Sequence, residues 1–406
     1  MKHEILVGDV LAGLRAMPDA SVQCVVTSPP YWGLRDYGVE GQIGLEPTPE
    51  EYVEKMVEVF REVKRVLRDD GTLWLNYGDC YCGSWGNAGH RPEIDGTPSY
   101  QREKATEYFN RGGWDERRET PPNQKIPGLK PKDLVGMPWR IAFALQADGW
   151  YLRSDIIWSK PNPMPESVTD RPTKSHEYVF LLAKRERYFY DIDSIRDPPT
   201  GRTGPMRFWK KGMEGQAKGN RNDAERVVQK DGSIGRNRRT VWEIPTQPTP
   251  EAHFATFPEA LVKPCIMAGT SERGACPSCG APWRRVVEAH RLRRDELDPS
   301  DPRYRPHRYS GAYEKINGKG DAGYQSSTTL GWAPSCTCGT EETVPCVVLD
   351  PFGGSGTVAK VARDLGRSSV MIELNPAYVG IMKKRLRVGE QLDTGVCEYA
   401  VREVGV

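Results

Sequence analysis

Short β-branched stretches alternate with segments of helical period along much of this chain of 406 residues. The stretches 22–27 and 347–350 are runs of mostly apolar residues, whereas 50–67 repeats apolar residues at the spacing of one helix face. Parallel strands need long crossover connections, and a helix is the usual one. The alternation therefore predicts an α/β fold built on a mostly parallel sheet.

The individual elements are predicted from the two patterns just described, β-branched stretches and segments of helical period. Strands are expected where β-branched residues cluster, and helices where apolar residues recur every three or four positions. The predicted strands are 5–7, 22–27, 71–76, 151–158, 176–183, 347–350 and 368–373. The predicted helices are 10–17, 50–67, 133–147, 257–267, 357–365 and 376–386.

Polar insertions interrupt this core. The hydrophobic fraction of 37% is low, and the 41 glycines and 33 prolines are many, which is typical of a core diluted by long loops. We therefore expect one large α/β domain with insertions. Its core segments are 1–78, 133–195, 246–275 and 339–406, and its insertions are 79–132, 196–245 and 276–338.

Charge and cysteine content say more about where the protein is located than about what it binds. The net charge of +2 says little, but residues 201–240 hold 11 Lys/Arg against 4 Asp/Glu, with Phe208 and Trp209 among them. This segment is either a contact for a phosphate backbone or a solvated basic loop. The sequence contains no apolar stretch of about 20 residues and no secretion signal. We therefore expect a cytoplasmic protein without a membrane span, whose ten cysteines are reduced or bind metal.

A glycine-rich loop follows the predicted strand 347–350 and leads into a helix. Its glycines allow close approach of a ligand, and the helix N-terminus favours a carboxylate. Glu373 ends the next predicted strand, 20 residues after Gly353, at the spacing used to hold ribose hydroxyls. The loop therefore indicates an adenosine-containing ligand, although a structural turn or a dinucleotide site would use similar residues. Its candidate ligand-binding residues are Asp350, Pro351, Phe352, Gly353, Gly354, Ser355, Gly356 and Thr357.

A second loop, Ser28, Pro29, Pro30 and Tyr31, follows the predicted strand 22–27. An exocyclic amine is a poor nucleophile, because its lone pair is delocalised into the ring, and it needs acceptors that draw it toward tetrahedral geometry. The Ser28 side chain and the Pro29 carbonyl are suitable acceptors, the prolines make the loop rigid, and Tyr31 offers a face for a stacked base. A Pro-Pro turn that merely closes a strand is the simpler alternative.

These two loops resemble the motifs of a known family. The segment 27–31, Thr-Ser-Pro-Pro-Tyr, is similar to the catalytic motif of amino-DNA-methyltransferases, and 350–356 is similar to their S-adenosylmethionine motif. The catalytic motif comes first, as in the permuted β class of these enzymes. Protein-glutamine methyltransferases place a similar loop after the cofactor loop. Asp9 resembles the acidic position near the cofactor adenine, and Thr256 lies in a segment similar to the one that closes over the methionine end.

The resemblance implies a circularly permuted, Rossmann-like methyltransferase that flips a base out of double-stranded DNA and transfers the methyl group in line. Segment 1–78 is then the catalytic half, 133–195 its continuation, 246–275 a core helix near the cofactor, and 339–406 the cofactor half. The insertions 79–132 and 196–245 are candidates for target recognition. A cognate restriction endonuclease is a candidate partner, and we expect a prokaryotic or phage-encoded monomer or homodimer.

The expected target is the N4 amine of cytosine. Family members with serine at the first motif position, here Ser28, are mostly cytosine-N4 enzymes, whereas aspartate is usual for adenine N6. Adenine N6 and methylation of RNA remain alternatives, as does a zinc-containing DNA-binding protein with an inactive methyltransferase fold. A carbon-5 enzyme with a cysteine nucleophile is disfavoured, because Cys265 and Cys346 follow prolines at element boundaries.

Two close cysteine pairs suggest a structural zinc site. Cys276 and Cys279 form a knuckle with Pro277 and Gly280, and Cys336 with Cys338 can supply the other half. The second spacing is one residue short of the usual pair, and 56 residues separate Cys279 from Cys336. Four-thiolate zinc is therefore the expectation, with free or redox-active thiols as the alternative. Zinc there would present the intervening Arg- and Tyr-rich segment to DNA.

Overall fold

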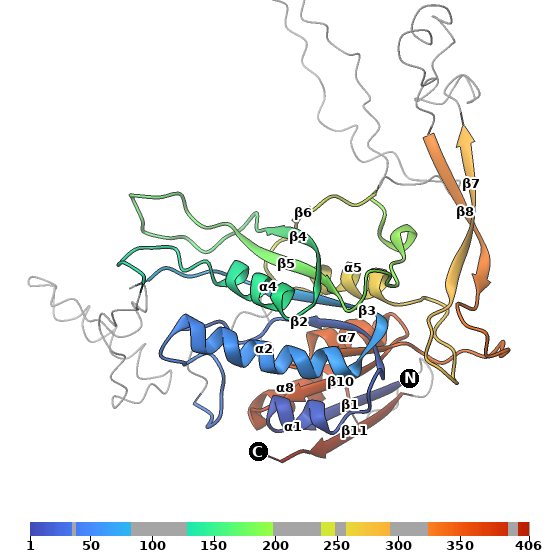
Figure 1. Ribbon diagram of the computed structural model, residues 1–406, viewed down its shortest axis with the longest axis horizontal. Helices are drawn as coiled ribbons and strands as arrows, with labels where there is room; N and C mark the ends of the chain where they lie inside the picture. The colour runs from blue at the N-terminus through green and yellow to red at the C-terminus, as the bar shows by residue number, and fades with distance from the viewer. Residues whose placement is uncertain are drawn as a thin grey trace, which may run out of the picture. The chain divides into compact units, whose positions relative to one another are not determined.

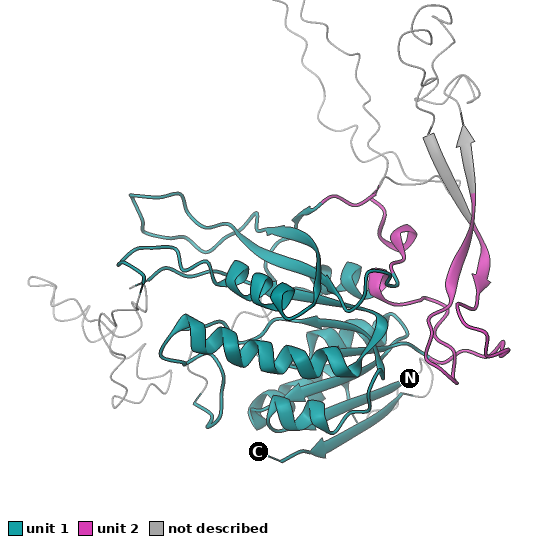
Figure 2. Ribbon diagram, in the orientation of Figure 1, with its two compact units in different colours: residues 1–189, 240–266, 345–406 teal, residues 190–239, 267–344 magenta. Residues whose placement is uncertain are grey.

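The computed structural model describes residues 1–34, 38–82, 128–197, 237–247, 257–292, 324–388 and 397–405. The chain divides into two compact units (Figure 2), of which unit 1 holds 1–189, 240–266 and 345–406, and unit 2 holds 190–239 and 267–344. Most of the predicted insertions 79–132 and 196–245 lies outside the described residues, as does Thr256. No helix in the described part of the chain is long and apolar enough to cross a bilayer.

The elements alternate as the sequence predicts. The strands are β1 (Lys2–Val7), β2 (Val22–Thr27), β3 (Leu67–Tyr77), β4 (Tyr151–Ser159), β5 (His176–Ala183), β6 (Val241–Glu243), β7 (Arg284–Leu292), β8 (Tyr324–Ala333), β9 (Val347–Asp350), β10 (Ser368–Glu373) and β11 (Glu398–Glu403). The helices are α1 (Val10–Arg15), α2 (Pro49–Val66), α4 (Met137–Ala147), α5 (Glu259–Gly269), α7 (Thr357–Asp364), α8 (Pro376–Leu386) and the 3₁₀ turn η1 (Ile192–Ile195).

Nine strands of unit 1 form one sheet in the order β11-β1-β10-β9-β2-β3-β5-β4-β6 (Figure 1). All neighbours are parallel except β5, which runs antiparallel to both β3 and β4. The prediction of a Rossmann-like, mostly parallel α/β sheet is therefore confirmed. In unit 2, β7 and β8 pair as a separate antiparallel ribbon.

Helices cover both faces of the large sheet. On one face α1 packs against α2 and α2 against α4, above a core that includes Val25, Phe60 and Leu73. On the other face α7 packs against α8, and Cys24 of β2 points its Sγ at the carbonyl of Cys265 in α5, at 3.9 Å. Consecutive residues of β2 thus face opposite layers, which explains why the whole strand is buried and mostly apolar.

The crossover helix α2 shows how local sequence sets its ends. Thr48 caps the helix by accepting the N–H of Glu51, and Pro49 occupies the first turn, where its missing N–H is not needed. Every third or fourth residue after that is buried against the sheet. The chain is then delivered from β2 to the neighbouring strand β3.

Two parts of the prediction need correction. The predicted helix 133–147 begins only at Met137, because Gly136 adopts a left-handed φ of 73° and Pro138 follows. The strands β6, β7, β8 and β11 were not predicted; in β11, five of the six residues are exposed and show no apolar alternation.

The order of strands reverses direction between β9 and β2, where open α/β sheets bind ligands. From β9 the chain crosses through α7 to β10 on one side, whereas from β2 it crosses through α2 to β3 on the other. The connections leave in opposite directions, so the loops that follow β9 and β2 border a gap at the carboxyl ends of the sheet. Both loops singled out in the sequence begin there.

Candidate active site

A buried hydrogen bond joins the two loops at their roots. Thr27, the last residue of β2, donates from Oγ1 to Oδ1 of Asp350, the last residue of β9, at 2.7 Å. The N–H of Phe352 donates to the same carboxylate oxygen at 3.1 Å. Thr27 is fully buried and Asp350 is 1% exposed, so the contact is shielded from water. The bond therefore fixes the start of one loop against the start of the other.

Aromatic hydroxyls hold the Ser-Pro-Pro-Tyr loop from beneath. Tyr52 of α2 donates to the Pro30 carbonyl at 2.8 Å, and Tyr77 of β3 donates to the Tyr52 hydroxyl at 2.9 Å. The N–H of Trp32 donates to Tyr77 at 3.0 Å. In the described part of the chain, no donor reaches the Pro29 carbonyl. The predicted acceptor is thus available, while its neighbour is already bonded.

The side chains of Ser28 and Tyr31 enter a polar network. Ser28 Oγ donates to Tyr31 Oη at 3.2 Å, and Tyr31 Oη donates to Glu177 Oε2 at 2.8 Å. Asn76 Nδ2 lies 3.4 Å from Ser28 Oγ and donates to Tyr31 Oη at 2.9 Å and Glu177 Oε2 at 3.0 Å. Lys160 Nζ donates to Glu177 Oε1. Four strands or their ends contribute to this cluster.

Sequence analysis did not single out Asn76, Glu177 or Lys160. Each lies at or next to a predicted strand end, which was the available signal, but their meeting depends on the strand order. Because β5 runs antiparallel, its start carries Glu177 to the edge where β2, β3 and β4 end. Asn76 is 5% exposed, and its Oδ1 has no hydrogen-bond partner in the described part of the chain. A bound ligand would explain such a buried acceptor.

Electrostatics keep the Tyr31 phenol protonated. Burial of the hydroxyl raises the pKa of Tyr31 well above its ordinary value, and the charge of Glu177 raises it further. The half-buried ring of Tyr31 packs against Tyr77, with centroids 4.5 Å apart and the ring planes tilted by 33°. One face of Tyr31 is therefore occupied by protein.

Glu373 organises the glycine-rich loop. Its Oε2 accepts the N–H of Gly354 at 2.7 Å, and its Oε1 accepts the N–H of Asn375 at 2.8 Å. The N–H of Leu374 also reaches this carboxylate, which keeps lone-pair capacity for a ligand hydroxyl. Burial raises the pKa of Glu373, and these backbone N–H groups oppose that shift. The carboxylate expected to hold a ribose thus also shapes the loop.

The rest of the loop is fitted closely to α8. Gly356 caps α7 with a φ of 77° and offers no capping side chain, and a Cβ there would lie 2.5 Å from Met382 Cγ. Arg385 donates to the hydroxyls of Ser355 at 2.6 Å and Thr357 at 3.0 Å. The first turn of α7 keeps N–H groups without a side-chain cap, as an anion site requires.

Asp9 lies at the same edge of the sheet. The N–H of Gly8 donates to the Glu373 carbonyl at 3.0 Å, which places the end of β1 beside the end of β10. One oxygen of Asp9 caps α1 by accepting the N–H groups of Leu11 and Ala12. The structure thus brings Asp9 near the Glu373 end of the loop, whereas Thr256 lies outside the described residues.

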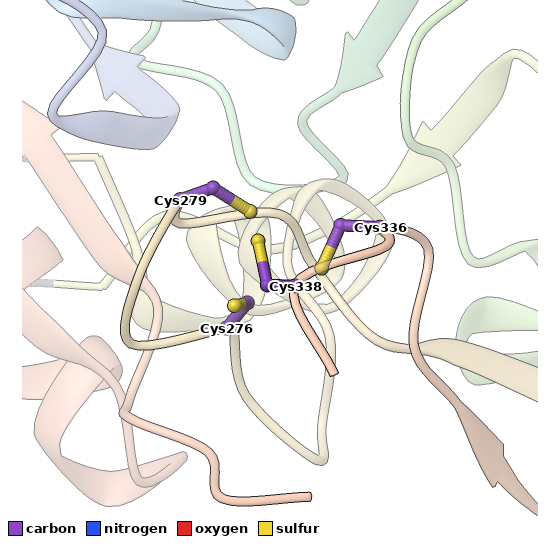
Figure 3. A group of neighbouring side chains, drawn as sticks. All are labelled: Cys276, Cys279, Cys336 and Cys338. Atoms are coloured by element: carbon purple, nitrogen blue, oxygen red, sulfur yellow. The ribbon is translucent and has the colours of Figure 1, made fainter. Parts of the chain in front are cut away.

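The two cysteine pairs meet in unit 2. Figure 3 shows the sulfur atoms of Cys276, Cys279, Cys336 and Cys338 gathered together, and all four lie within 4.8 Å of one another. The knuckle closes through the N–H of Gly280, which donates to the Cys276 carbonyl at 2.8 Å. The N–H of Cys279 and that of Ser278 lower the pKa of the Cys276 thiol to about 6. The spacing between Cys336 and Cys338, one residue short of the usual pair, therefore does not prevent the four sulfur atoms from meeting.

The chain is similar to known DNA methyltransferases. A family model described as DNA methylase matches residues 22–276 and 345–384 and leaves out 277–344. The chain is 40% identical over 393 residues to the Type II methyltransferase M.Cfr9I of Citrobacter freundii, covering 97% of this chain and 89% of that protein. It is 38% identical over 383 residues to the Type II methyltransferase M.SmaI of Serratia marcescens, covering 94% and 90%.

A solved structure shares the fold. The PvuII DNA methyltransferase, described as cytosine-N4-specific, superposes with a TM-score of 0.50 at 15% identity, over 97% of this chain and 88% of that one. At this identity the likeness concerns the fold alone. The fold is that of Rossmann-like methyltransferases.

The buried Asp350 should make stability depend on pH. Burial raises the pKa of Asp350 from 3.8 to about 7, against the hydrogen bonds from Thr27 and Phe352, and the charge of Glu373 adds to the rise. The folded state therefore binds this proton more tightly than the unfolded chain, so its stabilisation is complete below about pH 4 and lost as the pH rises toward 7. The difference corresponds to at most about 4 kcal/mol.

Asp350→Asn should remove this dependence. We expect the variant to have a higher thermal unfolding midpoint than the parent at pH 8 and a similar one at pH 4, measured by circular dichroism without ligand. Asp170→Asn is the control, because Asp170 is exposed and pairs with Lys132. Equal midpoints for Asp350→Asn and the parent at pH 8 would contradict a buried carboxyl of raised pKa.

Proposed function

The chain belongs to the DNA methylase family and is a DNA methyltransferase, and we propose that it methylates the exocyclic N4 of cytosine in double-stranded DNA at a specific site. The observation that carries the proposal is the position of Ser28, directly after Thr27. The Thr27 hydroxyl donates a hydrogen bond to Asp350, the residue at which the glycine-rich loop begins. A base amine accepted by Ser28 would lie beside a donor of methyl groups bound to that loop.

The glycine-rich loop fits S-adenosylmethionine. The uncapped N–H groups at the start of α7 suit the methionine carboxylate, and Glu373 has lone pairs for the ribose hydroxyls. Asp9, next to Gly8 at the neighbouring strand end, would lie toward the adenine. Residues 350–357 would line the methionine side. When bound, this cofactor supplies a methyl group made electrophilic by a positively charged sulfur.

The residues of the chain then have distinct tasks. The half-buried ring of Tyr31 would stack against a base rotated out of the duplex. Ser28 Oγ and the Pro29 carbonyl would accept the two amine hydrogens and orient the nitrogen lone pair toward the methyl group. The rigid Pro29-Pro30 backbone, anchored by Tyr52, would keep these acceptors in place. The nitrogen would then form its bond to the methyl carbon as the bond between that carbon and the sulfur breaks, and one amine proton would pass to solvent.

Serine at this position supports cytosine as the target. Ser28 is the first residue of the motif, where adenine-N6 enzymes usually carry aspartate, and this preference is the basis for N4. Adenine N6 is the alternative within the same family.

Replacing Ser28 by alanine should separate binding from transfer. We expect at least a ~100-fold loss of kcat, because one positioned hydrogen-bonding group is typically worth this much. The dissociation constant for S-adenosylmethionine should change little. Ser21→Ala is the control, since Ser21 precedes β2 at the opposite edge of the sheet and bonds the Pro18 carbonyl. Full activity of Ser28→Ala would show that another loop carries the chemistry.

The target base can be identified directly. The protein is incubated with labelled S-adenosylmethionine and duplex DNA of mixed sequence, and the digested nucleosides are separated and weighed by mass spectrometry. We expect the label in N4-methylcytosine. Label in N6-methyladenine would overturn the choice of base, and a digest without label would contradict the proposed function as a whole.

We further infer that the four cysteines of unit 2 bind a structural zinc ion. Four sulfur atoms within 4.8 Å of one another match the ligand set of such sites, and the knuckle turn at Cys276 is already formed. The ribbon of β7 and β8 begins and ends next to these cysteines, at Arg284 and Ala333. Zinc would tie the base of this ribbon together and present the segment between the strands to DNA.

Metal analysis tests this site. Protein purified without chelator should contain about one equivalent of zinc, and Cys276→Ser with Cys279→Ser should remove it. Cys397→Ser is the control, because Cys397 is a half-buried cysteine that does not belong to the four-cysteine cluster. A zinc content below about half an equivalent in the parent protein would contradict the assignment.

A further inference from the structure

Ser28 can accept from an amine only if its own hydrogen is directed elsewhere. A hydroxyl carries one hydrogen and two lone pairs, and a hydrogen facing the amine would meet the amine's own hydrogens. In the structure Ser28 Oγ donates to Tyr31 Oη at 3.2 Å. One lone pair of Ser28 Oγ faces Asn76 Nδ2 at 3.4 Å, and the other is left for another donor.

The direction of this bond is decided at Glu177. Tyr31 has a single hydrogen, which it donates to Glu177 Oε2 at 2.8 Å. An ionised carboxylate can only accept, so Tyr31 cannot turn its hydrogen toward Ser28 without leaving Glu177. The Tyr31 oxygen therefore accepts, from Ser28 Oγ at 3.2 Å and from Asn76 Nδ2 at 2.9 Å.

Other groups hold the carboxylate in this role. Lys160 Nζ donates to Oε1 of Glu177, and Asn76 Nδ2 donates to Oε2 at 3.0 Å. The side chains of Lys160 and Glu177 are only 19% and 16% exposed, so water competes weakly for this pair. Both carboxylate oxygens of Glu177 therefore face donors, which fixes the orientation of the side chain.

We propose that Glu177, fixed by Lys160 and Asn76, is a positioning residue that makes Ser28 a hydrogen-bond acceptor for the target amine. The inference rests on the proposed function and extends it to substrate choice. A base with an amine at this position is accepted, whereas a carbonyl oxygen, as in thymine or guanine, meets lone pairs and is rejected.

Glu177→Gln tests the direction of the chain. Lys160 always donates, so the amide oxygen of the new side chain turns to Lys160 and its NH₂ group turns to Tyr31. The Tyr31 hydrogen is then released toward Ser28, which loses its role as a free acceptor. We expect kcat to fall by ~10–100-fold, the range of one hydrogen bond to a charged group. KM for DNA and the affinity for S-adenosylmethionine should change by less than about threefold.

A second substitution should restore activity. In Glu177→Gln with Lys160→Met, nothing requires the amide oxygen to face position 160, so it can accept from Tyr31 again. We expect kcat of the double variant to exceed that of Glu177→Gln by about tenfold. A merely structural role predicts the opposite, because losing two network members would lower activity further.

Controls separate the possible failures. Glu166→Gln makes the same change at a nearby carboxylate that pairs with Arg171, and it should retain the parental kcat. Tyr31→Phe removes the hydroxyl that links Ser28 to Glu177 without altering Glu177, and it should lower kcat as Glu177→Gln does. An active parent with a fully active Tyr31→Phe variant, or a double variant no better than Glu177→Gln, would overturn the inference. An inactive parent would instead contradict the proposed function.

Discussion

The hydrogen bond between Thr27 and Asp350 is the contact on which the site depends. It joins residues 323 positions apart and is buried between neighbouring parallel strands. Both loops extend from this point, so the distance between them is set by the strand spacing of the sheet rather than by flexible side chains. Burial also raises the pKa of Asp350 to about 7, which lets the carboxyl keep a proton that water would remove. Placing the loops together thus has a cost in stability above neutral pH.

The direction of one strand in the sheet brings a charged side chain, Glu177, into the site. β5 is the one strand in the sheet antiparallel to both its neighbours, and it therefore begins at the edge where β2, β3 and β4 end. Glu177 enters the site for that reason. A carboxylate there orders the hydroxyls of Tyr31 and Ser28 without touching a substrate itself, and Lys160 keeps it from being an isolated buried charge.

Much of the site was predictable because each motif is local. Asp350 to Thr357 form a strand end, a turn and a helix start within eight consecutive residues, and the Ser-Pro-Pro-Tyr loop directly follows a buried strand. The conformation of such segments can be predicted from the positions of glycine and proline and from the spacing of apolar residues. The prediction failed where the local signal was weak. Gly136 delays the start of α4, and the exposed strand β11 has no apolar alternation to detect. Nothing local marked Glu177 as a partner of Tyr31, since they lie 146 positions apart.

The sequence by itself determined the α/β class, the two loops and their permuted order, and the two cysteine pairs, because these depend on short-range backbone preferences and periodicity. Only the tertiary structure decided that Glu177, Asn76 and Lys160 surround Tyr31, and that the unequal cysteine spacings converge within 4.8 Å. The physical reason is that hydrogen-bond direction and metal geometry require contacts between distant segments, and strand order and direction, not local propensity, determine which segments meet.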